Sequence, residues 1–100
     1  MNVIKYRSLK EYWDKHPQTQ KSLKFWHAVI RKAQWQSMND VQQAFSKCKT
    51  LNNERVHFEV AGGDFRLIAA FDFSSQTCWI QFSGTHTEYD RIDALSVHRF

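Results

Sequence analysis

The sequence predicts an α+β fold in which helices cover one face of an antiparallel sheet. In the first half, chain-breaking residues are scarce and apolar residues recur at helical spacing. In the second half, apolar and polar residues alternate between turn residues, and all three glycines (Gly62, Gly63 and Gly84) lie there. The 100 residues include 24 Leu, Ile, Val or Phe, so we expect one domain spanning residues 1–100.

The N-terminal segment predicts a strand and then a helix. Residues 2–6 contain Val3, Ile4 and Tyr6, which favour a short strand. Ser8 and Glu11 have the spacing of a capping box, in which a serine hydroxyl and a glutamate carboxylate bind free backbone amides. This motif predicts a helix over residues 9–15.

One or two further helices are indicated before the sheet. Within residues 18–35, apolar residues at steps of three and four form one stripe: Leu23, Trp26, Ile30 and Ala33. A cap-like segment at residues 37–40 predicts a short helix that ends near Phe45. Residues 46–53 are polar, and we expect a connection without regular structure.

The second half predicts three antiparallel strands. Alternating apolar and polar residues mark these strands at residues 55–60, 65–73 and 78–83. The connections at residues 61–64 and 74–77 are short, so consecutive strands must pair as antiparallel neighbours. After Gly84, residues 85–90 predict a turn that leads into a short helix.

Three segments resemble a known family. Residues 84–93 read GTHTEYDRID, residues 62–67 read GGDFRL, and residues 9–17 read LKEYWDKHP. Together they resemble the HigB-type toxins of bacterial type II toxin–antitoxin pairs, and the resemblance covers nearly the whole chain. It implies a RelE-like fold and an mRNA interferase, which is an endoribonuclease that in many members cleaves ribosome-bound mRNA. Glu59 departs from the family pattern, which often has Asn there.

The resemblance also implies a partner antitoxin of the helix-turn-helix, HigA type. DNA would then be contacted only indirectly, through that antitoxin, because the chain contains no recognition-helix pattern of its own. Two rival hypotheses are a non-catalytic RNA- or ribosome-binding module and a co-repressor that acts through its antitoxin.

RNA cleavage needs few protein groups because the 2′-hydroxyl is the nucleophile. A base, an acid and a cation suffice, so no metal or other cofactor is expected. The candidate catalytic residues are His86, Tyr89, Asp90 and Arg66.

His86 follows Gly84, where the lack of a side chain would let backbone approach a ligand. An imidazole titrates near pH 6.5 and can both donate and accept protons at neutral pH. Asp90 lies four residues later and would face His86 on a helical turn, to orient it or to act as base. The alternatives are a loop histidine and an ordinary surface carboxylate.

Tyr89 and Arg66 would contact the RNA. Tyr89 is suited to stacking on a base or donating a proton, and is equally suited to the core. Strand alternation puts Arg66 on the face opposite Phe65 and Leu67, where its guanidinium would hold phosphate oxygens or pair with Glu59 or Asp72. Arg55 and His57 alternate onto the same face of the neighbouring strand and are candidate RNA-binding residues, the alternative being simple exposure.

Charge and composition limit the other classes of protein to which the chain could belong. Residues 1–50 carry ten basic and three acidic side chains, whereas residues 51–100 carry four basic and seven acidic ones. The basic half suits a polyanion such as RNA, or is simply a solvated helix surface. No apolar run is long enough for a membrane span, no secretory signal is evident, and two cysteines make no disulfide framework. A cytoplasmic location is expected. We place Trp13, Trp26, Trp35 and Phe25 in the core.

Overall fold

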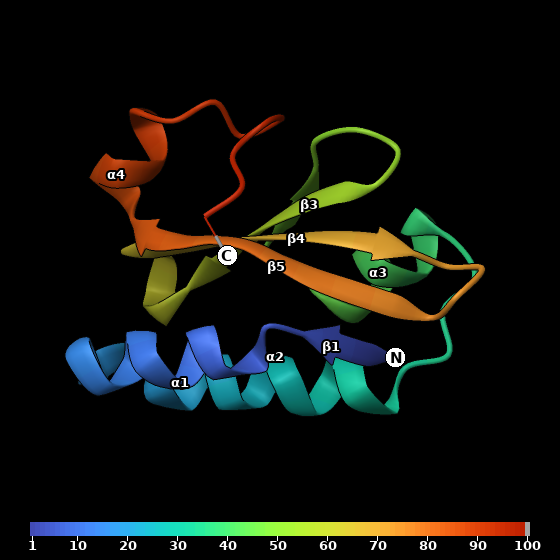
Figure 1. Cartoon of the computed structure of the whole chain (residues 1–100), viewed down its shortest axis with the longest axis horizontal. Helices are drawn as coiled ribbons and strands as arrows, with labels where there is room; N and C mark the ends of the chain where they lie inside the picture. Colours follow the sequence, from blue (N-terminus) through green and yellow to red (C-terminus); the bar gives the residue numbers. More distant parts are fainter. Residues whose placement is uncertain (100) are drawn as a thin grey trace.

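The computed structural model describes residues 1–99 and contains a five-stranded mixed sheet with the strand order β1-β5-β4-β3-β2 (Figure 1). The strands are β1 (Asn2–Ile4), β2 (Cys48–Thr50), β3 (Arg55–Val60), β4 (Phe65–Asp72) and β5 (Thr77–Thr85). The helices are α1 (Tyr6–Lys15), α2 (Gln20–Lys32), α3 (Met38–Ala44) and α4 (His86–Asp90), with 3₁₀ turns at Pro17–Thr19 and Ala61–Gly63. The predicted α+β class is confirmed.

The predicted three-stranded meander is only the middle of the sheet. β3, β4 and β5 pair antiparallel in sequence order, as predicted. At one edge β1 pairs parallel with β5, with Val3 opposite Cys78, and at the other edge β2 pairs antiparallel with β3. The segment predicted to be an irregular connection, residues 46–53, therefore contains a strand.

The predicted capping box at Ser8 is wrong. Helix α1 begins at Tyr6, directly after Lys5, whose backbone is left-handed with φ of 73°. Ser8 therefore lies inside the first turn, and its hydroxyl donates a hydrogen bond to the Lys5 carbonyl at 2.6 Å. Ser37 does precede α3, but its side chain makes no cap; instead the Asp40 carboxylate accepts a hydrogen bond from the Gln36 amide at 2.9 Å.

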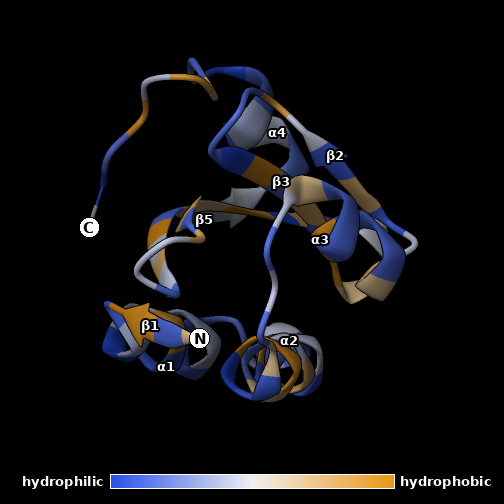
Figure 2. Cartoon of the chain, turned by 90° about the vertical axis from the view of Figure 1, so that its right-hand side faces the viewer, coloured by the Kyte–Doolittle hydropathy of each residue, from blue (hydrophilic) through white to orange (hydrophobic). Residues whose placement is uncertain are grey.

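Helices α1 and α2 lie side by side against one face of the sheet and enclose the main core (Figure 2). The predicted stripe on α2 is buried at Leu23, Trp26 and Ile30. Helix α3 adds Val41 to this core. The sheet contributes the predicted apolar faces of its strands, namely Val56, Phe58, Val60, Phe65, Leu67, Ala69, Phe71, Cys78 and Ile80. Burial of this surface is the main force that holds the two layers together.

The opposite face of the sheet is covered in part by α4 and the segment after it. A register shift between Ile68 and Ala69 accompanies the pairing of Ile68 with Phe82, and both side chains are buried. The Arg99 backbone amide donates to the Gln81 carbonyl at 3.0 Å, and the Arg99 guanidinium carbon lies 4.9 Å from the centre of the Phe82 ring. Helices α1 to α3 thus share one face, as predicted, while α4 lies on the other.

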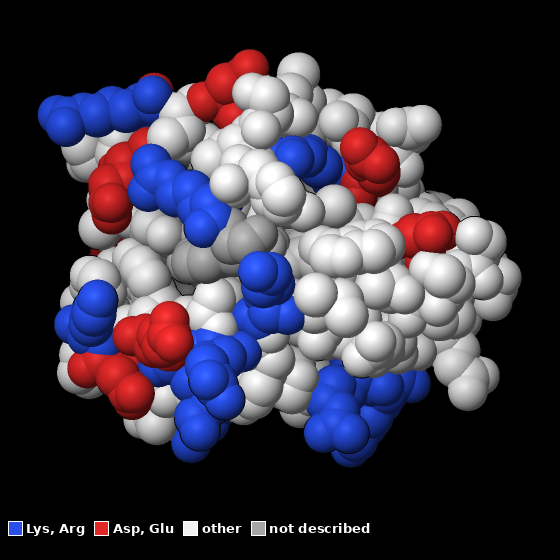
Figure 3. Space-filling model, in the orientation of Figure 1, with Lys and Arg blue, Asp and Glu red and all other residues white. Residues whose placement is uncertain are grey.

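Basic side chains gather along the helical layer, where Figure 3 shows Lys and Arg below the sheet. Helix α2 carries Lys21, Lys24, Arg31 and Lys32 and no acidic residue. Nowhere in residues 1–99 is a helix both long enough and apolar enough to cross a lipid bilayer.

Candidate active site

The end of β5 and the start of α4 form the corner on which the candidate residues lie. Thr85 caps α4 with a complete capping box: its hydroxyl accepts from the Glu88 amide at 3.1 Å, and the Glu88 carboxylate accepts from the Thr85 amide at 2.9 Å. The His86 amide donates to the Asp64 carbonyl at 2.9 Å. These bonds fix the first turn of α4 against the β3–β4 connection.

His86 and Asp90 contact each other across one turn of α4. His86 Nδ1 lies 3.0 Å from Asp90 Oδ2, and both side chains are more than half exposed. The predicted spacing of four residues thus brings the two groups together. Since a carboxylate beside Nδ1 favours a proton on that nitrogen, Nε2 becomes the atom that exchanges a proton with a ligand.

Arg66 lies on the face of β4 that the main core leaves free, as predicted. It is paired with Gly84 on β5 and with Glu59 on β3. Its side chain is only 11% exposed; Nη1 donates to the Gly63 carbonyl and to the Phe65 carbonyl, the latter at 3.3 Å. The guanidinium is therefore held rigidly beside the corner rather than moving freely in solvent.

Glu59, the departure from the family pattern, contacts Arg66. Its Oε1 lies 3.9 Å from Arg66 Nη1. Gly63 leaves room for this carboxylate, because a Cβ on Gly63 would lie 2.8 Å from Glu59 Oε1. The ion pair that we considered for Arg66 is thus present, and it adds an acidic group to the rim of the site.

His57 and Tyr89 form the floor of the site. Their rings stack with centres 4.7 Å apart, and neither ring nitrogen of His57 has a hydrogen-bond partner. Burial lowers the pKa of His57 to about 4, and the nearby Arg66 cation adds to this effect. His57 is therefore neutral at physiological pH. Burial also raises the pKa of Tyr89, so this hydroxyl keeps its proton at neutral pH.

Arg55 is engaged elsewhere. Its Nη1 donates to the Ala94 carbonyl at 3.1 Å and to the Val97 carbonyl at 2.7 Å. The guanidinium thus holds the segment after α4 against the sheet. Its predicted contact with RNA stays a prediction, and the structure gives it a different partner.

Gly84 is needed for packing rather than for approach to a ligand. The residue is buried, and a Cβ there would lie 2.4 Å from the Cζ atom of Phe82. The missing side chain makes space for the Phe82 ring. Because Gly84 is buried, its backbone is not a point at which substrate approaches closely, contrary to the prediction.

Lys49 is a neighbour of the site that the sequence did not reveal. It lies opposite His57 in the β2–β3 pairing, and its charge contributes to the lowered pKa of that imidazole. No sequence pattern marked the position of Lys49, because β2 has only three residues and lies within a polar segment. Among residues 1–99, no three His, Cys, Asp or Glu side chains lie close enough together to hold a metal ion.

This corner combines a fixed guanidinium, an imidazole–carboxylate pair, a neutral imidazole and a protonated phenol. Residues 19–92 match the family described as the RelE-like toxic component of a toxin–antitoxin system, HigB_toxin. The chain belongs to the HigB toxin family. The RelE-like part of the fold prediction follows from this membership, as does the general class of partner, an antitoxin.

Individual HigB proteins are similar over almost their full length. The mRNA interferase toxin HigB of Escherichia coli strain K12 is 33% identical over 102 residues, which cover 99% of this chain and 95% of that protein. Proteins named mRNA interferase HigB from Escherichia coli O157:H7 and Shigella flexneri match with the same identity and coverage.

Proposed function

We propose that the chain, acting as one RelE-like domain, is a toxin that cleaves mRNA. The observation that carries this proposal is the corner at which Arg66, His57, Tyr89 and the His86–Asp90 pair meet, in a chain of the HigB family whose relatives are named mRNA interferases. These groups supply the cation, the proton acceptor and the proton donor that cleavage of RNA needs.

In the proposed reaction the 2′-hydroxyl oxygen of one nucleotide attacks the adjacent phosphorus. The bond from phosphorus to the 2′ oxygen forms, and the bond to the 5′ oxygen breaks. The products are a 2′,3′-cyclic phosphate and a free 5′-hydroxyl. A base removes the proton of the 2′-hydroxyl and an acid protonates the leaving 5′ oxygen, so protons balance.

The charge and protonation state of each side chain suit it to one of these tasks. Asp90 orients the His86 ring, and His86 exchanges a proton with the substrate through Nε2. Tyr89 keeps its proton and serves to stack on a base or to donate. Arg66 stabilises the negative charge that builds on the phosphate oxygens. His57, neutral at pH 7, is a further acceptor beside Arg66.

We further propose that ribosome-bound mRNA is the substrate, that the protein acts in the cytoplasm, and that its antitoxin is a helix-turn-helix protein of the HigA type. Helix α2, with four basic residues and no acidic one, supports an attraction to ribosomal RNA. The toxin would reach DNA only through the antitoxin. Arg55 belongs to this proposal as an RNA contact that competes with its bonds to the C-terminal segment.

Inducible expression followed by primer extension on cellular mRNA tests the proposal. The parent chain should create new 5′ ends, whereas His86→Ala and Arg66→Ala should reduce cleavage by about 10²-fold or more, as is typical for loss of an acid–base group or a charge-stabilising donor. Thr87→Ala, on an exposed position of α4, is the matched control and should cleave like the parent. Equal cleavage by all four proteins would refute the residue assignment.

Purified protein then separates the remaining hypotheses. Cleavage of mRNA in translating ribosomes, but not of the same free RNA, supports ribosome dependence. Protection of the message without any cleavage would instead favour a non-catalytic binding module.

A further inference from the structure

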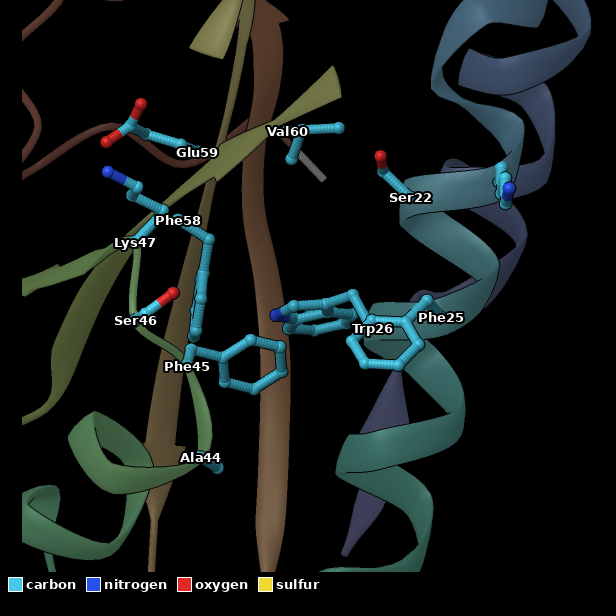
Figure 4. Close-up of a pocket in the computed structure, with 11 residues that line it drawn as sticks. Ser22, Phe25, Trp26, Ala44, Phe45, Ser46, Lys47, Phe58, Glu59 and Val60 are labelled. Carbon is cyan, nitrogen blue, oxygen red and sulfur yellow. The ribbon is translucent and has the colours of Figure 1, made fainter. Parts of the chain in front are cut away.

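A solvent-open groove lies on the helical side of β3 and adjoins the candidate active site at Glu59 (Figure 4). It has a volume of about 520 Å³ and lies between α2, the segment after α3 and β3. This volume is within the range of about 300–1,000 Å³ that is common for binding pockets. We call it the α2–β3 groove; its lining includes Phe25, Trp26, Ala44, Phe45, Phe58 and Val60.

The walls of the groove are aromatic, and one of them is open to solvent. Phe25, which the sequence placed in the core, is 64% exposed. Within residues 1–99 the only other large apolar side chain of comparable exposure is Leu95, at 54%. Because Phe25 borders a hollow that continues to Phe45 and Phe58, its exposure belongs to a continuous apolar surface, which is typical of an interaction site.

Behind the wall of the groove lies an unsatisfied donor. Trp26 is 97% buried, since only 3% of its surface is exposed, yet its indole Nε1 has no hydrogen-bond partner. Figure 4 shows the nitrogen end of this indole directed toward Phe45 and Phe58. A buried polar group without a partner is uncommon, but this nitrogen has almost no accessible surface, so the groove is defined by its open apolar wall and its lysines and not by this donor.

The rim of the groove is basic. Lys21 on α2 and Lys47 after α3 both line it, and α2 carries no acidic residue. The one acidic lining residue, Glu59, is paired with Arg66. An occupant that suits this surface has apolar side chains for the aromatic walls and carboxylates for the two lysines.

We propose that the α2–β3 groove binds an acidic, amphipathic segment of the cognate antitoxin. Apolar side chains of the segment pack against Phe25 and Phe45, and its carboxylates pair with Lys21 and Lys47. RNA fits less well: a base can stack on Phe25, but Trp26 and Phe58 are buried and expose no second ring for a successive base. This inference rests on the proposed function only in taking an antitoxin as the protein that neutralises the chain.

The purified cognate antitoxin is the probe, with binding measured by calorimetry. Phe25→Ser and Lys47→Glu should each raise the dissociation constant by at least about 10-fold, the effect expected when a central aromatic or a complementary charge is lost. Leu95→Ser and Lys10→Glu are matched controls at exposed positions outside the groove, and should bind like the parent. Ala44→Trp, which fills the groove without removing a side chain from the core, provides an independent third variant.

A cellular readout separates docking from folding and from catalysis. The groove variants should still arrest growth, whereas co-expression of the antitoxin should no longer restore it. Unchanged dissociation constants in all three groove variants would overturn the proposal. Normal antitoxin binding with slower mRNA cleavage would also overturn it and would assign the groove to RNA. If the parent chain cleaves no mRNA, the proposed function fails, while the dissociation constants still decide the role of the groove.

Discussion

The imidazole of His57 lies against Tyr89, with both nitrogens buried and unpaired. Strand alternation was enough to predict that His57 shares a face with Arg66, because side chains on a pleated strand alternate strictly. The same pattern contains no information about its stacking partner, which comes from a helix about thirty positions later in the chain. The neutral state of His57 is therefore a property of the folded protein alone.

This neutral imidazole predicts how stability depends on pH. The pKa of His57 is about 4 in the folded protein but near 6.5 in the unfolded chain, so only the unfolded chain takes up this proton between those values. The stabilising contribution is complete above pH 6.5 and is lost as the pH falls toward 4. After allowance for partial exposure, we expect a loss of about 1–2 kcal/mol.

Urea unfolding at pH 7 and pH 4 measures this contribution. Because carboxylates also titrate in this range, the comparison is with His57→Phe, which retains an aromatic ring beside Tyr89. The free energy of unfolding should fall less in His57→Phe than in the parent. The same decrease in both proteins would show that His57 does not titrate as described.

Among the elements, β5 and α4 depend on the packing of the Phe82 ring against Gly84, which lies two residues later in the same strand. Gly84→Ala places a Cβ against the Phe82 ring, and we expect a loss of about 1–3 kcal/mol in the free energy of unfolding, as for overpacked cores. The double variant that combines Gly84→Ala with Phe82→Leu should recover part of that loss. Gly62→Ala is the control. Its Cβ would touch nothing, so its loss of stability arises from the positive φ of 72° at this position. Phe82→Leu cannot relieve that backbone strain. Equal effects of Phe82→Leu in both backgrounds would contradict this account.

Elements with a long periodic pattern were predicted from the sequence, whereas short or distant ones were not. The apolar stripe of α2 and the alternation in β3 and β4 each extend over six residues or more, so local pattern determined them. β2 has only three residues, and β1 pairs with a strand that begins 75 positions later, at Thr77. The start of α1 depends on the left-handed backbone of Lys5, which no residue preference signals.

At the scale of the whole molecule, the segment after α4 covers the outer face of the sheet, and Arg55 holds it there. Arg55→Ala removes the donor to the Ala94 and Val97 carbonyls. We expect faster amide hydrogen exchange at Val97 and Arg99 and unchanged exchange in β4. Arg91→Ala, an exposed arginine on the same segment, should leave the pattern unaltered. Unchanged exchange in Arg55→Ala together with slower mRNA cleavage would instead assign Arg55 to RNA.

The candidate site was predictable where it depends on local geometry and unpredictable where it depends on the path of the chain. The turn of α4 brings His86 to Asp90, and the pleat of β4 puts Arg66 on the face that α1 to α3 do not cover. The hydrogen bonds of Arg55, in contrast, depend on where the C-terminal segment lies. The proximity of Lys49 to His57 depends on the pairing of β2 with β3. Phe25 was misplaced because it was assigned to the core as a large aromatic residue, although it lies outside the apolar stripe of α2.

We propose that this corner directs an RNA 2′-hydroxyl onto its own phosphodiester. This proposal is tested most directly with a message that carries a single 2′-deoxynucleotide on the 5′ side of a mapped cleavage position, presented to the purified protein on ribosomes. We predict that cleavage at that position disappears, while other positions in the same message are cut as before and end in cyclic phosphates. Undiminished cleavage at the deoxy position would contradict the account.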